Sequence, residues 1–234
     1  GLSVGPVERT PEDERGFRLL ELFKRKNARR TILACVPWSL MDIATYGVGV
    51  FTPVILLQQS ARDSNHVAKG AQTVADTVAN ERSMLEATTI LDLLLLVGFF
   101  IGVMLVDKIG RIRLQTAGFI GMTIGLGILA FAGDGDDSIV ILVFAGFAIF
   151  NLSMNAGPNT TTYILPAEVF PTQLRATGHG FAAACAKTGA LAGTIVLPLL
   201  IHAAGLTIGL GAVMICCILG ALVTYLARTE TTKI

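Results

Sequence analysis

Residues 176–200 read ATGHGFAAACAKTGALAGTIVLPLL, an apolar stretch with one lysine, Lys187, near its middle. A helix needs about 20 predominantly apolar residues to cross a bilayer, so this stretch is predicted to span a membrane. A lysine costs roughly 3 kcal/mol or more at the bilayer centre. Lys187 lies about ten residues, or roughly 15 Å of helix, from either end, which is long for a side chain that snorkels to the interface. We therefore expect Lys187 to face a protein interior, a water-filled path or an anion.

An acidic residue, Asp42, occupies a similar position in a second apolar stretch, residues 32–57. Ionisable residues inside spanning segments usually pair with one another or with a substrate. Lys187 is therefore interpreted as an anion ligand or as the counter-charge of Asp42. A buried acid and a buried base in two spans indicate a transport path rather than an enzyme.

The composition is that of a membrane protein along most of the chain. Of 234 residues, 53% are hydrophobic and 15% are charged, and the mean hydropathy is +0.66. The charges form short blocks between apolar runs that are long enough to cross a bilayer. We predict an all-α membrane protein, a bundle of six transmembrane helices. The expected spans are residues 31–58, 84–106, 112–132, 138–165, 177–201 and 205–227.

No sequence pattern indicates an enzyme, a metal site or a cofactor site. The chain has no nucleophile and base arrangement, no phosphate-binding loop and no Cys/His cluster. Basic residues border the apolar runs instead of forming a patch with interleaved aromatics, so no nucleic-acid partner is expected. The cysteines all lie inside expected spans and are interpreted as packing residues. They are Cys35, Cys185, Cys216 and Cys217.

Charged segments flank the spans and predict the orientation of the chain. Residues 1–30 are expected to form a cytoplasmic linker with an amphipathic helix, and residues 228–234 a cytoplasmic tail. Both termini are placed in the cytoplasm because Lys and Arg concentrate on that side. Residues 59–83 are expected to be a long polar external loop, helical in part. The polar start at Gly1 is interpreted as the middle of a longer protein.

Three polar side chains in the first span are spaced four residues apart. Trp38, Asp42 and Tyr46 would stack on one face of a helix, because residues i, i+4 and i+8 are near neighbours there. We interpret Asp42 as a proton-titrating carboxylate flanked by hydrogen-bond donors for a substrate. The alternative is a structural acid that pairs with a neighbouring helix.

The fourth span is interrupted by the sequence NAGPN, which contains Pro158 and ends at Asn159. Proline removes a backbone hydrogen bond, and nearby polar side chains can satisfy the groups that it leaves unpaired. One hypothesis places Asn159 in a central cavity. The other is hydrogen bonding between helices at a kink.

Two charged motifs lie at the side predicted to be cytoplasmic. The loop DKIGRIR joins the second and third spans, and its Gly110 allows a tight turn. Glu168 and Arg175 flank Phe-Pro-Thr after the fourth span. Either Glu168 with Arg111 or Asp107 with Arg175 is predicted to form a cytoplasmic latch that breaks during transport. Ordinary loop charges that set topology are an equally open interpretation.

Together these motifs resemble the major facilitator superfamily. DKIGRIR resembles the D-[RK]-x-G-R-[RK] loop repeated in that superfamily. PAEVFPTQLRATGHG resembles the motif after the tenth span in its sugar-porter-like and phosphate:proton symporter branches. With W-x3-D-x3-Y before these motifs and the lysine segment AKTGA after them, nearly the whole chain resembles the C-terminal half of a phosphate:proton symporter or a close bacterial relative.

The resemblance implies that the six spans are the seventh to twelfth of a twelve-span transporter that works by alternating access, with its N-terminal half missing. It implies a small anionic solute, foremost inorganic phosphate, carried with a proton across a bacterial inner membrane. Asp42 would be the proton-linked carboxylate. The other implied site residues are Trp38, Tyr46, Asn159 and Lys187 for substrate, and Asp107, Gly110, Arg111, Glu168 and Arg175 for a cytoplasmic gate.

Two other hypotheses stay open at this stage. The first is a sugar or organic-acid proton symporter of the same superfamily. The second is a non-transporting membrane protein, either a sensor or a half-length subunit that pairs with another chain.

Overall fold

The computed structural model describes residues 19–67, 74–133 and 140–228, and within these ranges the regular structure is entirely helical. Six helical segments there are long and apolar enough to cross a membrane, which confirms the predicted all-α fold of six spans. The helices are α2 (Arg25–Val67), α3 (Val74–Ile109), α4 (Arg111–Gly133), α5 (Val140–Met154), α6 (Thr160–Val169), α7 (Arg175–Ala204) and α8 (Leu206–Leu226), with the π-helical turn η1 (Asn155–Asn159) between α5 and α6.

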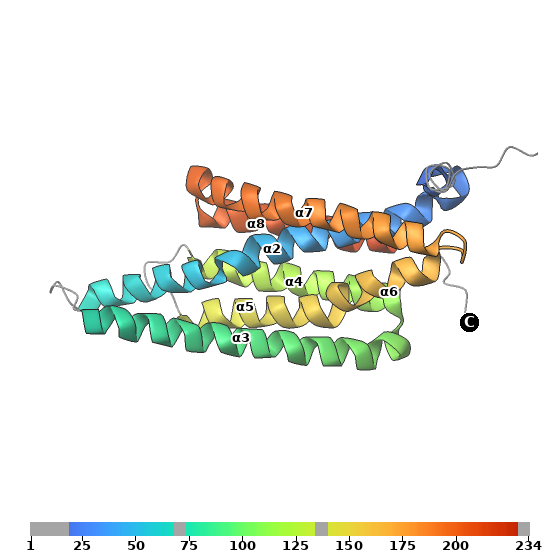
Figure 1. The fold of residues 1–234 in the computed structure, drawn as a ribbon. Helices are drawn as coiled ribbons and strands as arrows, with labels where there is room; N and C mark the ends of the chain where they lie inside the picture. Colours follow the sequence, from blue (N-terminus) through green and yellow to red (C-terminus); the bar gives the residue numbers. More distant parts are fainter. Residues whose placement is uncertain (1–18, 68–73, 134–139, 229–234) are drawn as a thin grey trace, which may run out of the picture.

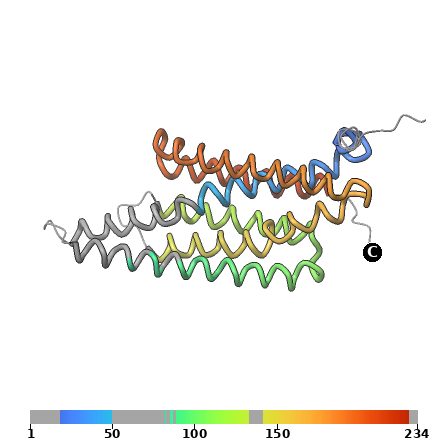
Figure 2. The backbone as a smooth tube through the Cα atoms, in the orientation of Figure 1, coloured from blue at the N-terminus to red at the C-terminus, as the bar shows by residue number. Residues whose placement is uncertain are grey.

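The helices run side by side along one axis (Figure 1). Helices α7 and α8 lie on one side, α3 and α5 on the other, and α2 and α4 between them. The start of α2, the α3–α4 turn, the α6–α7 turn and the end of α8 gather at one end of the bundle, which we call the linker end (Figure 2). The charged motifs of the sequence therefore meet at one end.

The expected polar loop at residues 59–83 is much shorter in the structure. Helix α2 continues to Val67 and α3 begins at Val74, so the expectation of a partly helical segment is met and that of a long loop is wrong. A change from apolar to polar residues shows where a helix leaves the apolar layer of the membrane. It does not end the helix, because most polar residues have a good helix propensity.

The linker before α2 is described from residue 19 onward. Residues 19–23 form a short helical turn before α2, which begins at Arg25. The rest of the expected amphipathic segment, residues 1–18, and most of the expected tail, residues 229–234, lie outside the described residues.

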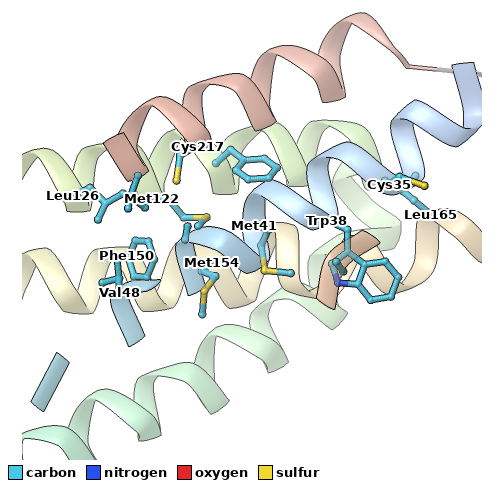
Figure 3. Packing of buried hydrophobic residues seen from close by; sticks show 14 of the residues in the cluster. Cys35, Trp38, Met41, Val48, Met122, Leu126, Phe150, Met154, Leu165 and Cys217 are labelled. Atoms are coloured by element: carbon cyan, nitrogen blue, oxygen red, sulfur yellow. The ribbon is translucent and has the colours of Figure 1, made fainter. Parts of the chain in front are cut away.

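Methionine and phenylalanine side chains fill the centre of the bundle (Figure 3). Met41 of α2, Met122 of α4 and Met154 of α5 meet there beside the buried ring of Phe150. Buried Cys217 packs into the same cluster from α8, and all four cysteines carry free thiols. Unbranched methionines fill irregular gaps between helices, which suits a core formed by four elements.

Helices α2 and α7 approach each other very closely at two glycines. A Cβ added to Gly189 would lie 2.3 Å from the backbone oxygen of Ser39, and one added to Gly193 would lie 2.4 Å from that of Ile43. Small residues four apart allow such contact between helices in a membrane. This contact sets the register between the two helices that carry Asp42 and Lys187.

Candidate functional site

The structure brings Asp42, Tyr46 and Lys187 together across the α2–α7 contact. The Lys187 Nζ lies 3.2 Å from the Asp42 Oδ2 and donates a hydrogen bond to it. The same ammonium donates to the Tyr46 hydroxyl at 3.2 Å and lies 4.9 Å from the centre of the Tyr46 ring. Of the two interpretations of Lys187, the counter-charge to Asp42 is therefore present in this structure.

The two charges of the pair differ in their surroundings. The Asp42 side chain is 5% exposed, whereas the Lys187 side chain is 58% exposed. Lys187 reaches the carboxylate from a face of the bundle that the described residues leave uncovered, and Tyr46 and Tyr163 are also exposed. A solute on that face can meet the ammonium without first reaching Asp42.

Trp38 lies one helical turn from Asp42 toward the linker end, and it is buried in the interior. Its ring packs against Tyr163 of α6, with centres 4.7 Å apart, and against His179 of α7 at 5.6 Å. The indole Nε1 is buried and has no hydrogen-bond acceptor among the described residues. A buried donor without an acceptor is costly, which suits a group that binds a solute.

Tyr163 and His179 are site neighbours that the sequence analysis missed. Tyr163 follows Asn159 by four residues and could have been placed on the same helical face from that spacing. His179 lies in the second turn of α7, near the start of that helix. Its contact with Trp38 depends on the packing of α7 against α2, for which the sequence carries no local signal.

Asn159 closes the π-helical turn in the fourth span. Its Nδ2 donates to the Asn155 Oδ1 at 2.7 Å, and the Thr160 hydroxyl donates to the Asn155 backbone oxygen at 2.7 Å. The expected interruption at Pro158 is therefore a π turn whose polar groups bond within the turn. Such turns are rare and often lie at functional sites. In this structure Asn159 bonds to Asn155 rather than to the Asp42–Lys187 pair.

A bidentate ion pair joins α4 to α6 at the linker end. The Arg111 Nη2 lies 2.8 Å from the Glu168 Oε1, and the Arg111 Nε donates to both carboxylate oxygens, at 3.1 and 3.0 Å. Asp107 binds the Nη1 of the same arginine at 2.9 Å. The turn between α3 and α4 depends on Gly110, whose φ of +91° suits glycine.

The alternative pair of Asp107 with Arg175 is wrong for this structure. Asp107 is one helical turn from Arg111 and is used by it, since i, i+4 side chains are neighbours on a helix. Arg175 begins α7, and its buried Nε has no acceptor among the described residues. Of the expected gate residues, Arg111, Glu168 and Asp107 form one cluster, and Arg175 is outside it.

Comparison with known proteins identifies the family to which these six spans belong. Residues 18–234 match the family model described as sugar (and other) transporter. The chain belongs to this family of the major facilitator superfamily. It is therefore an integral, multi-pass membrane protein related to transporters and not to enzymes.

Two relatives of this chain carry phosphate in their names. It is 36% identical over 166 residues to the inorganic phosphate transporter PHO84 of Saccharomyces cerevisiae, which covers 70% of this chain and 26% of the relative. It is 32% identical over 175 residues to a repressible high-affinity phosphate permease of Neurospora crassa, which covers 73% of this chain and 28% of the relative.

The chain spans little more than a quarter of the length of these two relatives. Both come from fungi, so they give no support to the bacterial inner membrane expected from the sequence.

Proposed function

We propose that the chain is the C-terminal half of a proton-coupled carrier of inorganic phosphate. The observation that carries the proposal is the ammonium of Lys187 held between Asp42 and Tyr46 in the middle of two spans. A mid-span cation suits an anionic solute, and the names of the relatives indicate which anion.

The coupling mechanism follows from competition for Lys187. While Asp42 is ionised, it holds the ammonium. A proton on Asp42 removes that attraction, so Lys187 becomes available to phosphate, with charge-assisted hydrogen bonds from its ammonium and a bond from the Tyr46 hydroxyl. Loss of the proton restores the pair and expels the anion. Proton and phosphate therefore bind together and leave together.

Trp38 and Asn159 complete the proposed substrate site. The Trp38 indole supplies a donor that lacks an acceptor in this structure, and a phosphate oxygen is a suitable acceptor. Asn159 must exchange its bond with Asn155 for one with the solute. The π turn allows such a change, because its hydrogen bonds already depart from the regular helical pattern.

The proposed gate is the Arg111–Glu168 pair at the linker end, which we place on the cytoplasmic side. Arg25, Lys26 and Arg29 lie in the first turns of α2 there, and Arg113 lies in the first turn of α4. This concentration of basic residues favours the cytoplasm. With the pair formed, α4 and α6 are held together at that end. Opening toward the cytoplasm would require the pair to separate.

A second six-helix half would cover the face that exposes Lys187 and Tyr46. Two halves that rock around a site between them produce alternating access. The chain alone leaves a polar, charged stripe in lipid, so we expect it to be inactive without that half.

The test is uptake of labelled phosphate into proteoliposomes that contain the full-length parent protein, with and without an inward proton gradient. Wild type should accumulate phosphate only with the gradient. The variant Asp42→Asn should lose accumulation at least tenfold while it retains exchange of bound phosphate. Normal gradient-driven accumulation by this variant would exclude Asp42 from coupling. Folded wild-type protein without any phosphate uptake would refute the substrate.

A sugar or an organic acid is the second candidate, because the family is described as sugar (and other) transporters. A competition screen on the same proteoliposomes separates the candidates. If a sugar is carried and Lys187→Ala leaves its affinity unchanged, the anion proposal fails and the sugar proposal replaces it. If folded protein carries no solute in the screen, a sensor or a subunit of another assembly becomes the better hypothesis.

A further inference from the structure

A cavity of about 710 Å³ lies at the linker end, away from the Asp42–Lys187 pair. It lies between the short helical turn of residues 19–23, the first turns of α2 and the α6–α7 turn. Its volume is within the range of small-molecule sites. The lining residues are Glu21, Lys26, Asn27, Arg30, Pro171, Gln173 and Leu174.

The cavity presents two cations on one face of α2. Lys26 and Arg30 are four residues apart and therefore adjacent on the helix. Asn27 lies between them and is buried. Its Nδ2 donates to the Glu21 backbone oxygen at 2.9 Å, and its Oδ1 accepts from the Arg30 Nη1 at 3.5 Å. These bonds hold this wall of the cavity in place, while the Lys26 side chain is largely exposed.

Glu21 is the acidic group of the cavity and is already paired. Its carboxylate accepts a hydrogen bond from Lys24 and lies 3.6 Å from the Lys26 Nζ. The bond from Lys24 lowers the pKa of Glu21, so this carboxyl is ionised at neutral pH. Glu21 carries one negative charge and also binds Lys24. It therefore does not neutralise the positive charges of both Lys26 and Arg30, and the cavity keeps a net positive charge.

The helical turn beside the cavity exposes large apolar side chains. Leu20 and Phe23 are 68% and 60% exposed, although Leu22 of the same turn is fully buried. The Phe23 ring also touches Phe181 of α7 edge-on, with ring centres 5.4 Å apart. A turn anchored through Leu22 therefore presents apolar side chains beside the cationic cavity, at the level where α2 enters its apolar span.

This combination selects a lipid over a soluble anion. Exposed leucine and phenylalanine favour contact with acyl chains at the membrane boundary. Basic residues clustered at the start of a span favour the phosphate of an anionic lipid. Arg25 and Arg29 are exposed at the same level and add to the positive field.

We propose that this cavity binds the phosphate headgroup of an anionic membrane lipid, with Lys26 and Arg30 as its charged ligands and Gln173 as a donor from the opposite wall. The lipid would bridge the start of α2 to the turn that leads into α7. These two helices carry Asp42 and Lys187, so bound lipid would stabilise their packing at this end. The site is distinct from the transport site, since Lys26 and Asp42 are about 24 Å apart by helical rise.

The test is direct binding of a fluorescent phosphatidic acid to the full-length parent protein in a neutral detergent, with phosphatidylcholine carrying the same dye as the reference lipid. The double variant Lys26→Gln/Arg30→Gln should weaken phosphatidic acid binding about tenfold or more, because each basic residue near a membrane surface contributes about 1 kcal/mol. The matched control is Arg25→Gln/Arg113→Gln, which removes two exposed cations at the same end outside the cavity. Thermal unfolding checks that each variant is folded, and Arg30→Gln alone replaces the double variant if that one is not.

Three results would overturn the proposal. An equal loss in the matched control would assign binding to the general surface charge. Unchanged binding in the cavity variant would remove Lys26 and Arg30 from the site. Displacement of the lipid by millimolar inorganic phosphate would identify a soluble-anion site instead. None of these readouts requires transport, so the lipid site and the proposed phosphate transport can fail separately.

Discussion

At the scale of single residues, the Asp42–Lys187 pair is unequal, and the inequality decides how each side chain responds to loss of the other. Asp42 is buried, so without Lys187 its carboxylate is left in the interior with no cation. Lys187 is largely exposed, so without Asp42 its ammonium remains accessible to solvent or solute. Leaving a buried charged group unpaired is the costlier change.

We therefore predict that Lys187→Ala destabilises the full-length protein at neutral pH by about 1–3 kcal/mol, whereas Asp42→Asn changes stability much less. The double variant should recover most of the loss, because no buried charge remains. Thermal unfolding of the four proteins forms a double-mutant cycle. Additive losses would show that the two side chains contribute independently, contrary to the geometry.

Trp38 offers a test of binding that keeps an aromatic ring in the packing. Trp38→Phe retains a ring against Tyr163 and His179, and it removes the Nε1 donor together with the rest of the five-membered ring. Because Trp38 is buried, the smaller side chain leaves a small cavity, so a modest fall in the melting temperature is expected. The KM for phosphate should rise about tenfold or more, because a hydrogen bond to a charged partner contributes about 1.5–3 kcal/mol. An unchanged KM would place Trp38 outside the binding site.

The site residues on α2 and Lys187 could be predicted from the sequence, whereas the packing of Tyr163 against Trp38 could not. Trp38, Asp42 and Tyr46 share one stripe of α2 because of the helical repeat alone. The choice of Lys187 as the partner needed only its unusual position in an apolar span. Tyr163 joins the site through the packing of α6 against α2, which depends on side chains distant in sequence.

At the scale of elements, the fourth span changes its hydrogen-bond pattern at the π turn, and side chains of other helices bond to it just beyond that turn. The π turn ends at Asn159, and the next turn is tied to two other helices through Gln115 of α4. Thr161 donates to the Gln115 Oε1 at 2.7 Å, and the Gln115 Nε2 donates to the Thr224 hydroxyl at 2.8 Å. All three side chains are buried. The sequence predicted an interruption from Pro158, whereas its form depends on these partners.

The candidate site also depends on the close contact between helices α2 and α7. Gly193→Ala would place a Cβ 2.4 Å from the Ile43 backbone oxygen, so one helix must move. We expect a loss of about 1–3 kcal/mol in unfolding free energy, typical of overpacking, together with a weaker Asp42–Lys187 contact and lower transport.

Gly180 in the same helix is the matched control for this contact, because a Cβ added there meets no atom within 4 Å. Gly180→Ala should be neutral or stabilise the helix by up to about 1 kcal/mol. Thermal unfolding in detergent measures both variants. Similar effects of the two substitutions would mean that the close approach is unimportant for stability.

At the scale of the whole molecule, hydropathy was sufficient for the number of spans, but not for the lengths of the helices. The long loop expected at residues 59–83 is largely helix because polar residues can extend a helix beyond the apolar layer. The gathering of charged motifs at one end was predictable, since it follows from alternating spans. Pairing of Arg111 with Glu168, rather than of Asp107 with Arg175, depends on the turn at Gly110, which points Arg111 toward α6.

This end of the molecule gives the last prediction, which concerns opening at the linker end. In the bidentate pair, Glu168 is about three-quarters buried, whereas Asp107, the other partner of Arg111, is 76% exposed. Exposed ion pairs contribute little, and partly buried bidentate pairs contribute more. Glu168→Gln should therefore favour the state open at this end, and Asp107→Asn should have little effect.

The measurement is labelling of a cysteine placed at Tyr163, on the exposed face near the linker end, with a membrane-impermeant maleimide applied from the side of that end. The four native cysteines are first replaced by alanine in the full-length protein. The labelling rate should rise severalfold in Glu168→Gln and stay near the parent value in Asp107→Asn. Equal rates in all three proteins would make Arg111–Glu168 a static contact, because a latch that controls access must change access when it is weakened.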